Sequence, residues 1–428
     1  MKISACAIRR IGLYYFIGIL CLPSLVVADD WPQWRSINRD GKSSETGLLQ
    51  SWPEAGPPLL WKIEGCGTGY SAMSISNGRL FTMGNHGDDE YVLAFLEQDG
   101  KPLWRVRNGK AYRSSSGNGP RSTPTVDGDL VYSLGATGNL SCLSADDGRQ
   151  VWQVNILQVF DGNNLGWGLS ESVLIEGDMV ICTPGGPDKS IVAIDKKTGR
   201  TIWTSKGINH PASYASAMAL TVDNVRQIVH VTGHAAVGLQ ATDGKLLWQY
   251  SRASSTANCA TPLVHDNNVF VTSGYGTGCA LLELAGHDGM PQSQEVYFNK
   301  VMKNHHGGVV LVNGYVYGYS NRFVSMNFLT GQRAWRDPGP GKCSLIYADG
   351  HLYALSQDGI MALVEATPQQ YVEKSRFVFN KYQQFKLGGV EEQDEKPTFT
   401  PPVIANGRLF LRDQDTIYCY DITDPIDH

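Results

Sequence analysis

Polar and charged side chains stand just before many of the short apolar segments of this sequence. The candidate ligand-binding residues among them are Arg121, Glu171, His210, Tyr214, Asn258, Lys303, His305 and His306. Charged groups gathered in a narrow opening have perturbed pKa values and are typical of functional sites. The set predicts a site for an anionic or polyhydroxylated ligand, with Arg121 and Lys303 as anion contacts. The alternative is a water-filled opening whose polar groups cap strand ends, and no residue is assigned a catalytic role.

The adjacent histidines His305 and His306 raise the question of a metal site. Side chains of neighbouring residues on a strand point to opposite faces, so such a pair does not bind one metal. The sequence also contains no Cys-x-x-Cys and no His-Glu-x-x-His motif. We therefore predict hydrogen-bonding roles for both imidazoles and assign no metal site.

A repeated phrase indicates which elements position these residues. It consists of a glycine, three variable residues of which the first is usually basic, and a tryptophan. The copies are Gly100–Trp104, Gly148–Trp152, Gly199–Trp203, Gly244–Trp248 and Gly331–Trp335, with a truncated Pro57–Trp61 near the start. Successive tryptophans lie 43 to 51 residues apart, except for one interval of 87 residues across a degenerate copy. A fixed period of this length is the signature of a propeller blade or another repeat array.

A predicted hairpin precedes each phrase. Thr123–Tyr132, Gly308–Tyr317 and Pro402–Phe410 each have the pattern of a strand, an Asp-Gly or Asn-Gly turn and a second strand. Such dipeptides favour type I′ turns, which need positive φ at both central residues. A third strand and the tryptophan strand complete a blade of four antiparallel strands. Eight units can be counted, and Phe298 and Phe377 stand near the expected tryptophan positions in the fifth and seventh.

The predicted fold class is therefore all-β, an eight-bladed β-propeller of four-stranded antiparallel blades. The eighth unit has only three strands, so the N-terminal strand with Trp61 is expected to pair with it and close the ring. Closure removes the open sheet edges. Glycine then occupies a tight turn where positive φ costs little, and tryptophan fills the space between blades with its indole N–H on a carbonyl. The residues before the inner strands converge at one end of the central channel.

The first residues have the pattern of a secretory signal peptide. Lys2, Arg9 and Arg10 precede the apolar run Ile11–Leu22, and small residues lead to Ala28. We expect cleavage after Ala28, with an uncleaved anchor as the alternative. The protein is expected to be exported, either periplasmic or associated with the cell envelope, with no transmembrane segment in the mature chain. The predicted domains are a signal peptide over 1–28, an N-terminal extension over 29–56 and one propeller over 57–428.

Charge and cysteine content narrow the classes of partner. Loss of Lys2, Arg9 and Arg10 with the leader lowers the formal net charge from −5 to −8. An acidic chain without a basic stripe argues against nucleic-acid binding. The seven remaining cysteines are scattered singly, so at least one is unpaired, and one or two disulfides stay open. We expect a monomer.

The full pattern Ala-x-Asp-x-x-Thr-Gly-Lys-x-x-Trp resembles the PQQ (pyrroloquinoline quinone) repeat. Quinoprotein alcohol dehydrogenases and the assembly lipoprotein BamB share this repeat, and the resemblance covers nearly the whole mature chain. A narrower similarity is to exported PQQ-like propellers of planctomycetes. The segments that carry it are Trp31–Arg35, Asn38–Gly41, Trp167–Ser172, Cys182–Gly186 and Asn304–Gly308.

The resemblance implies two functions. One is an exported binding or scaffold module for a protein or saccharide partner. The other is a PQQ-dependent dehydrogenase of an alcohol or sugar, in which Glu171 and Asn258 would match the family's Ca²⁺ ligands. The chain departs from that family because it has no adjacent Cys-Cys pair, no Cys-x-x-Cys-His motif and no acidic residue within Lys303–His306. These departures favour the binding module, so no cofactor is assigned, PQQ with Ca²⁺ is kept as the alternative, and enzymatic activity stays open.

Overall fold

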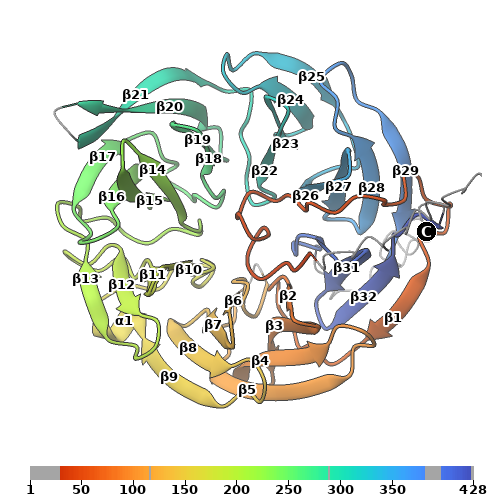
Figure 1. Cartoon of the computed structure of the whole chain (residues 1–428), viewed down its shortest axis with the longest axis horizontal. Coiled ribbons are helices and arrows are strands. Elements are labelled where there is room, and N and C mark those ends of the chain that lie inside the picture. Colours follow the sequence, from red (N-terminus) through yellow and green to blue (C-terminus); the bar gives the residue numbers. More distant parts are fainter. Residues whose placement is uncertain (1–28, 115–116, 288–289, 381–396, 426–428) are drawn as a thin grey trace, which may run out of the picture.

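The strands form a closed ring of blades around a common axis, as the computed structural model in Figure 1 shows. The structure describes residues 29–114, 117–287, 290–380 and 397–425. Its strands make eight sheets of four strands each, and the one helix in these residues is the short α1 (Ile156–Val159). The predicted all-β, eight-bladed propeller is confirmed. The predicted signal peptide lies outside the described residues, and the domain boundaries at 28 and 56 stay predictions.

Each blade runs from an inner to an outer strand. Blades 1 and 2 contain β2 (Ser74–Ser76), β3 (Arg79–His86), β4 (Asp89–Leu96), β5 (Pro102–Lys110), β6 (Thr125–Asp127), β7 (Leu130–Leu134), β8 (Asn139–Ser144) and β9 (Gln150–Asn155). Blades 3 and 4 contain β10 (Leu174–Glu176), β11 (Met179–Cys182), β12 (Val192–Asp195), β13 (Thr201–Thr204), β14 (Met218–Val222), β15 (Val225–Val231), β16 (Ala236–Gln240) and β17 (Leu246–Tyr250). Blades 5 and 6 contain β18 (Leu263–His265), β19 (Asn268–Ser273), β20 (Gly278–His287), β21 (Met290–Asn299), β22 (Val309–Val312), β23 (Tyr315–Tyr319), β24 (Phe323–Asn327) and β25 (Arg333–Asp337). Blades 7 and 8 contain β26 (Cys343–Ala348), β27 (His351–Ser356), β28 (Ile360–Glu365), β29 (Glu373–Val378), β30 (Val403–Ala405), β31 (Arg408–Asp413), β32 (Thr416–Asp421) and β1 (Leu59–Ile63).

The ring closes as the sequence predicts. The outer strand of blade 8 is β1, which pairs antiparallel with β32 and places Trp61 opposite Cys419. The two ends of the chain therefore share one sheet, and no blade is left with three strands.

Inner hairpins use the predicted turn chemistry in part. Asn313 and Gly314 have φ of 47° and 79°, and Asn406 and Gly407 have φ of 56° and 70°, as a type I′ turn requires. At Asp127–Gly128 the expectation is wrong, because Asp127 is the last residue of β6 and only Gly128 has positive φ.

The tryptophan and glycine of the repeat meet across neighbouring blades. Trp152 donates from Nε1 to the carbonyl oxygen of Lys196 at 3.0 Å, and its ring lies over Gly199. Equivalent carbonyl bonds join Trp61 to Glu97, Trp104 to Ala145, Trp203 to Ala241 and Trp335 to Thr367, at 2.8 to 3.1 Å. The predicted role of the repeat is thereby confirmed at these positions. Trp248 differs, since its indole donates to Gln227 within its own blade.

The fifth blade uses a tyrosine at the tryptophan position. Tyr297, and not the predicted Phe298, lies against Gly331 and donates its hydroxyl to Phe328 at 2.8 Å. The reason is the register, because Tyr297 pairs with Leu281 immediately before the irregularity in the β20–β21 ladder. In blade 7, Phe377 packs on Gly56 of the N-terminal extension.

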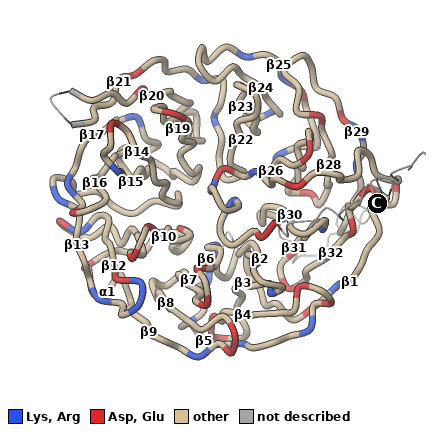
Figure 2. The backbone as a smooth tube through the Cα atoms, viewed as in Figure 1, with Lys and Arg blue, Asp and Glu red and all other residues tan. Residues whose placement is uncertain are grey.

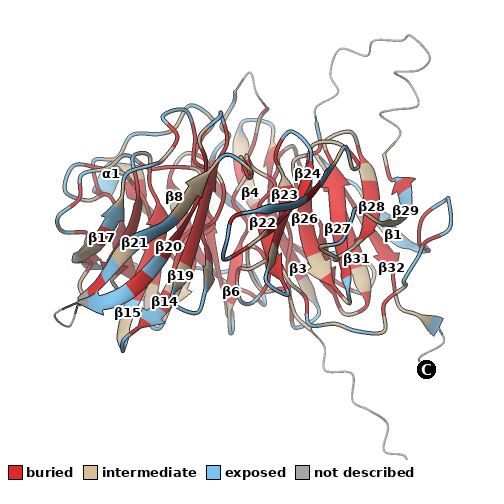
Figure 3. Cartoon of the chain, turned by 90° about the horizontal axis from the view of Figure 1, so that it is seen from above, coloured by how far each residue is buried: buried red, intermediate tan, exposed pale blue. Residues whose placement is uncertain are grey.

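The apolar core is divided among the interfaces between blades. Figure 3 shows buried strand segments throughout the ring, with exposed residues in the turns and also on strands such as β15 and β21. Trp31 and Trp52 of the N-terminal extension join the core cluster formed with blades 1, 7 and 8. All seven cysteines of the described residues are free thiols and six are buried, which fits their prediction as small apolar residues. No helix of the described residues is long and apolar enough to cross a bilayer.

Candidate functional site

Residues Trp31–Lys42, here called the channel finger, enter the centre of the ring. Figure 1 shows the red segment turning in the middle of the ring and then running outward beside β26. Trp31 forms an isolated bridge with Ile75 of β2, and Lys42 forms one with Tyr347 of β26. The finger therefore connects the inner strands of blades 1 and 7.

Two buried arginines fix the finger to the blades. Arg35 donates to the carbonyl oxygen of Val309, and Arg39 donates to those of Ser172 (2.7 Å) and Val173 (3.1 Å). Burial lowers the pKa of each guanidinium group to about 10, so both remain charged at neutral pH. Arg35, Ser36 and Arg39 all have positive φ, between 56° and 72°. Such conformations are costly for residues other than glycine and persist where the surroundings determine them.

A cavity of about 220 Å³ lies at the channel mouth, and Trp34 of the finger lies in its lining. The indole of Trp34 donates from Nε1 to the hydroxyl of Thr261 at 2.9 Å, which fixes the orientation of the ring. Every blade entry except that of blade 7 contributes to the wall. The lining residues are Trp34, Tyr70, Arg121, Trp167, Ser170, Tyr214, Ser216, Cys259, Tyr275, His305, His306, Phe399 and Pro401.

Aromatic rings form a nearly continuous belt around this cavity. Tyr70 contacts Phe399 with ring centroids 5.2 Å apart, and Phe399 contacts His306 at 4.8 Å. The belt continues from His306 to His305 at 4.8 Å and from His305 to Tyr275 at 4.9 Å. A separate pair, Trp167 and Tyr214, has centroids 5.2 Å apart. The arrangement offers flat apolar faces on several sides of a bound ring.

Four of the eight predicted site residues line the cavity. They are Arg121, Tyr214, His305 and His306. Arg121 donates to the carbonyl oxygens of Gly119 (3.1 Å) and Gly117 (2.9 Å), and its guanidinium lies 5.2 Å from the centroid of the Tyr70 ring. Because four predicted residues do converge at the channel mouth, the blade entries form a site as the repeat implies, although their role in ligand binding stays a prediction.

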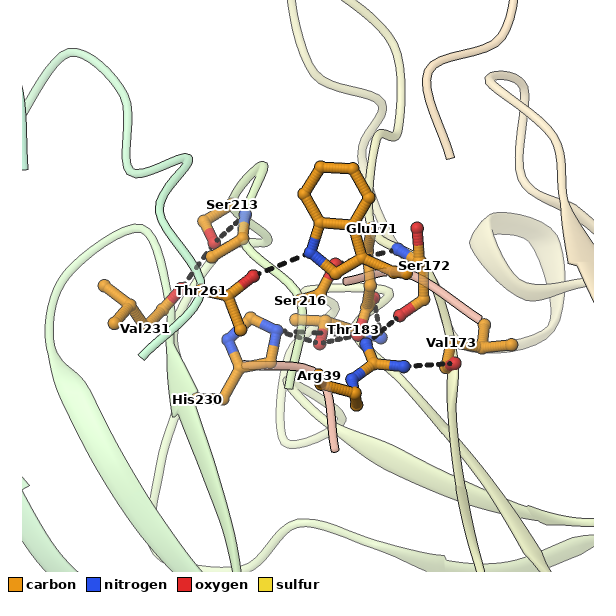
Figure 4. Close-up of polar contacts among 12 residues, drawn as sticks. Arg39, Glu171, Ser172, Val173, Thr183, Ser213, Ser216, His230, Val231 and Thr261 are labelled. Atoms are coloured by element: carbon orange, nitrogen blue, oxygen red, sulfur yellow. Dashed lines mark hydrogen bonds and ion pairs between the residues drawn. The ribbon is translucent and has the colours of Figure 1, made fainter. Parts of the chain in front are cut away.

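The carboxylate of Glu171 makes hydrogen bonds inside the protein and does not face the cavity. It is buried, and its carboxylate accepts from the backbone N–H of Thr183 at 2.8 Å and from the Thr183 hydroxyl at 3.2 Å. His230 approaches the same carboxylate at 3.5 Å, and Arg39 of the finger interacts with it electrostatically. Figure 4 shows Glu171, Thr183, His230 and Arg39 gathered at this point. Glu171 is thus a buried carboxylate with internal partners, and its charge interacts with that of Arg39 in the finger.

The other three predicted residues also lie outside the lining. Asn258 is buried and braces its loop, because its amide donates to the carbonyls of Thr232 and Ser254 and its oxygen accepts from Ser254 and Ser273. His210 is hydrogen-bonded to Thr232 at 3.0 Å. Lys303 donates its backbone N–H to Ser320. The expectation of an anion contact at Lys303 has no counterpart in the cavity lining.

His305 and His306 both contribute to one cavity, which contradicts the expectation that they face opposite sides. The alternation rule does not apply, because the strand β22 begins only at Val309. The hydroxyl of Tyr275 is hydrogen-bonded to Nε2 of His305 at 2.9 Å, and the Gln357 amide donates to Nε2 of His306 at 2.7 Å. Burial and the nearby Lys342 charge lower the pKa of His305 to about 4 and that of His306 well below its usual value.

The free energy of unfolding should fall as the pH is lowered through the range in which the protonation of these histidines differs between the folded and the unfolded chain. Below pH 6.5 the unfolded chain binds protons at His305 and His306, whereas the folded chain keeps both neutral, so the free energy of unfolding falls as the pH falls from 6.5 toward 4. Urea denaturation at pH 7.5, 6.5 and 5.5 measures the loss. In the double variant His305→Asn/His306→Gln we expect a smaller loss between pH 6.5 and 5.5, and an unchanged loss would assign the pH dependence to other groups.

The repeat pattern does not identify several of the lining residues. Trp34 lies in the extension, Phe399 follows a long insertion and Tyr275 lies in a loop between the second and third strands of blade 5. Trp34 and Trp167 both stand within segments that carry the family resemblance, Trp31–Arg35 and Trp167–Ser172, and this is the one hint that could have identified them.

The fold implies PQQ with Ca²⁺, and the residues present do not fit that pair. The two candidate ligands, Glu171 and Asn258, already use their side-chain oxygens in the bonds described above and lie outside the cavity lining. Within the described residues, no group of three or more His, Cys, Asp and Glu side chains could hold a metal ion. Cys259 is the single cysteine among the described lining residues, and burial raises the pKa of its thiol to about 12.

Comparison with known proteins places the chain among repeat propellers. A family model described as outer membrane protein assembly factor BamB matches residues 88–337. Quinoprotein alcohol dehydrogenase PedH of Pseudomonas putida is 25% identical over 154 residues, which is 35% of this chain and 25% of that protein. BamB of Salmonella typhimurium is 28% identical over 87 residues, which is 19% of this chain and 21% of that protein. The matches thus span a quarter or less of these relatives.

Solved structures share the fold at low sequence identity. BamB from Moraxella catarrhalis superposes with a TM-score of 0.57 at 16% identity, covering 86% of this chain and 98% of that chain. The quinohemoprotein alcohol dehydrogenase from Comamonas testosteroni superposes with a TM-score of 0.60 at 12% identity, covering 92% and 81%. Both a BamB and a dehydrogenase therefore have the same architecture as this chain.

Proposed function

Because this chain belongs to the family described as outer membrane protein assembly factor BamB, we propose that it is an exported binding module whose channel-mouth cavity receives a saccharide. The observation that carries the proposal is the aromatic lining of the cavity, with Trp34, Trp167 and Tyr214 around it. Flat aromatic side chains contribute large apolar contact area at low entropic cost, and pyranose rings present complementary apolar faces.

The dimensions support a ligand of about one ring. The cavity volume of about 220 Å³ is below the ~300–1,000 Å³ of pockets for drug-sized ligands. A single sugar ring or the end of a glycan chain suits this space better than an extended peptide. Trp34, oriented by its bond to Thr261, forms part of the wall that the proposed ligand contacts.

The dehydrogenase alternative rests on the printed names of relatives such as the P. putida enzyme. Its expected ligands Glu171 and Asn258 are committed to internal hydrogen bonds, and this favours the binding module. Calorimetry of the purified protein with PQQ and Ca²⁺, followed by dye reduction with a panel of alcohols and sugars, tests the alternative. Stoichiometric PQQ binding with turnover would overturn the binding module.

Export and partner remain part of the proposal. The basic residues and apolar run before Ala28 support a cleaved leader, and N-terminal sequencing of the mature protein tests it. We expect the protein to act as a monomer. The surface charges agree with the absence of a nucleic-acid partner, since Figure 2 shows Lys and Arg interspersed with Asp and Glu around the ring.

Removal of the Trp167 ring should weaken saccharide binding. Burial of an aromatic face contributes about 1.5–3 kcal/mol, so Trp167→Ala is expected to raise Kd about 10- to 100-fold. Binding of a panel of neutral and acidic mono- and oligosaccharides is measured by calorimetry and by the fluorescence of the cavity tryptophans. Trp167→Phe, which keeps a flat ring beside Tyr214, is the matched control and should retain most of the affinity. If no saccharide of the panel binds the wild type, the proposed function is wrong.

A further inference from the structure

Arg121, which is partly buried, differs from the buried arginines of this protein. The donors of the buried arginines, Arg35, Arg39 and Arg412, bond oxygen atoms of the fold. Arg412, for example, donates to the backbone carbonyls of four residues, which are Ser71, Met83, Gly67 and Gln414. Arg121 makes two side-chain hydrogen bonds, both to carbonyls of its own loop, and lies in the cavity lining. A guanidinium has five N–H donors, so three remain available.

The head group of Arg121 is fixed in position before any ligand arrives. Its two bonds close the short loop from Gly117 to Arg121, and its plane lies 5.2 Å from the centroid of the Tyr70 ring. A fixed head group loses little conformational freedom on binding, which favours affinity. Its remaining donors therefore form a ready site for oxygen atoms.

The cavity supplies no charge that could neutralise Arg121. None of the described lining residues is Asp or Glu, and Arg121 has no ion pair among the described residues. The charge of Lys342 adds to the positive field, since it acts on Cys259, His305 and His306 in the wall. Asp413 lies near Tyr70 but is hydrogen-bonded to Asn380 at 2.8 Å. An uncompensated arginine in a desolvated cavity favours an anionic ligand group.

Resting on the saccharide-binding function proposed above, we infer that the ligand is a carboxylated pyranose, a uronic acid or a glycan that ends in one. The carboxylate binds Arg121, because the guanidinium fork matches the geometry of two carboxylate oxygens. The sugar ring then contacts the aromatic faces of Trp167 and Tyr214, which line the same cavity as Arg121. The proposal joins the two features of the lining, aromatic faces and one unpaired cation.

Calorimetry with four probes tests this inference: D-glucuronic acid, D-glucose, D-glucose 6-sulfate and an oligosaccharide with a terminal glucuronate. For the wild type we expect glucuronate to bind at least about 10-fold tighter than glucose, as a charge-assisted hydrogen-bond pair predicts. Raising the salt concentration should weaken glucuronate binding and leave glucose binding unchanged. The free acid and the oligosaccharide distinguish a monosaccharide ligand from a glycan end.

The variant Arg121→Gln should lose about 10-fold or more in glucuronate affinity while its glucose affinity stays the same. Arg121→Lys keeps the charge but lacks the forked guanidinium, so its glucuronate affinity should lie between those of the wild type and Arg121→Gln. It also controls for loss of the loop structure. The matched control is Arg113→Gln, which removes an exposed arginine paired with Asp88 in the same region and should change neither affinity.

The outcomes separate the two proposals. If glucose binds as tightly as glucuronate, or if Arg121→Gln weakens both equally, the carboxylate inference is wrong and the saccharide site stands. If the 6-sulfate binds as well as glucuronate, the site recognises negative charge and not the carboxylate, which also overturns the inference. If none of the probes and none of the wider saccharide panel binds, the proposed function itself fails.

Discussion

Replacing Arg39 with methionine is expected to lower the free energy of unfolding by about 3–5 kcal/mol, because it removes the donor of two buried carbonyl groups and a cation that interacts with a buried carboxylate. Arg39 is 3% exposed, and it bonds the carbonyls of Ser172 and Val173. Its loss leaves those carbonyls without their donor and the Glu171 carboxylate without its cation. Chemical denaturation monitored by far-UV circular dichroism measures the change.

Two further variants show whether charge is the cause. The double variant Arg39→Met/Glu171→Gln should lose less unfolding free energy than the sum of the losses in the two single variants, because it buries no unpaired charge. Lys42→Met removes a cation of the same finger that pairs with Asp40 at the surface, and it should cost at most about 1 kcal/mol. Equal losses for Arg39→Met and Lys42→Met would show that the finger contributes little to the stability of the ring.

Substituting alanine for Gly199 is expected to cost about 2–5 kcal/mol. The backbone φ of Gly199 is +73°, and a left-handed conformation costs about 1–2 kcal/mol for a residue with a Cβ. An added Cβ would also lie 2.9 to 3.1 Å from atoms of the Trp152 ring, and such overpacking costs about 1–3 kcal/mol. The Trp152 ring would lose its close contact with the next blade, and the thermal midpoint of unfolding should fall accordingly.

Gly177 of the same blade provides the matched control. Its φ is +59°, but an added Cβ meets no atom within 4 Å. Gly177→Ala should therefore lose only the conformational part, about 1–2 kcal/mol. The difference between the two variants isolates the contact between tryptophan and glycine. Equal losses would mean that the glycine of the repeat is selected by turn geometry alone.

The sequence could reveal the propeller because the signals for it are local and repeated. The spacing from Gly148 to Trp152 and from Gly199 to Trp203 recurs at the length of a blade, and each turn needs a residue tolerant of positive φ. The last blade likewise has only three strands of its own, and the strand at Trp61 was available to be its fourth. Even the blade without tryptophan follows the rule, with Tyr297 in place of the indole.

Part of the candidate site was also visible. The ring places the blade entries together, and for this reason Arg121, Tyr214, His305 and His306 could be grouped although they are far apart in the sequence. Which entry residues face the opening could not be derived, because this depends on the loop conformation at each position. His305 and His306 illustrate the limit, since a strand rule was applied to residues that precede the strand.

What the sequence alone determined is the repeat, the number of blades, the closure of the ring and the positive φ of its turns, all of which follow from short-range patterns. The tertiary structure decided the rest. Only there does the finger lie at the centre of the ring, where Arg39 bonds Ser172 and its charge interacts with the buried carboxylate of Glu171, a predicted ligand residue. Only there does Trp34 join Phe399, 365 positions away in the numbering, in one aromatic cavity. The physical reason is that these contacts join segments whose separation along the chain carries no periodic signal, so packing, and not local pattern, places them together.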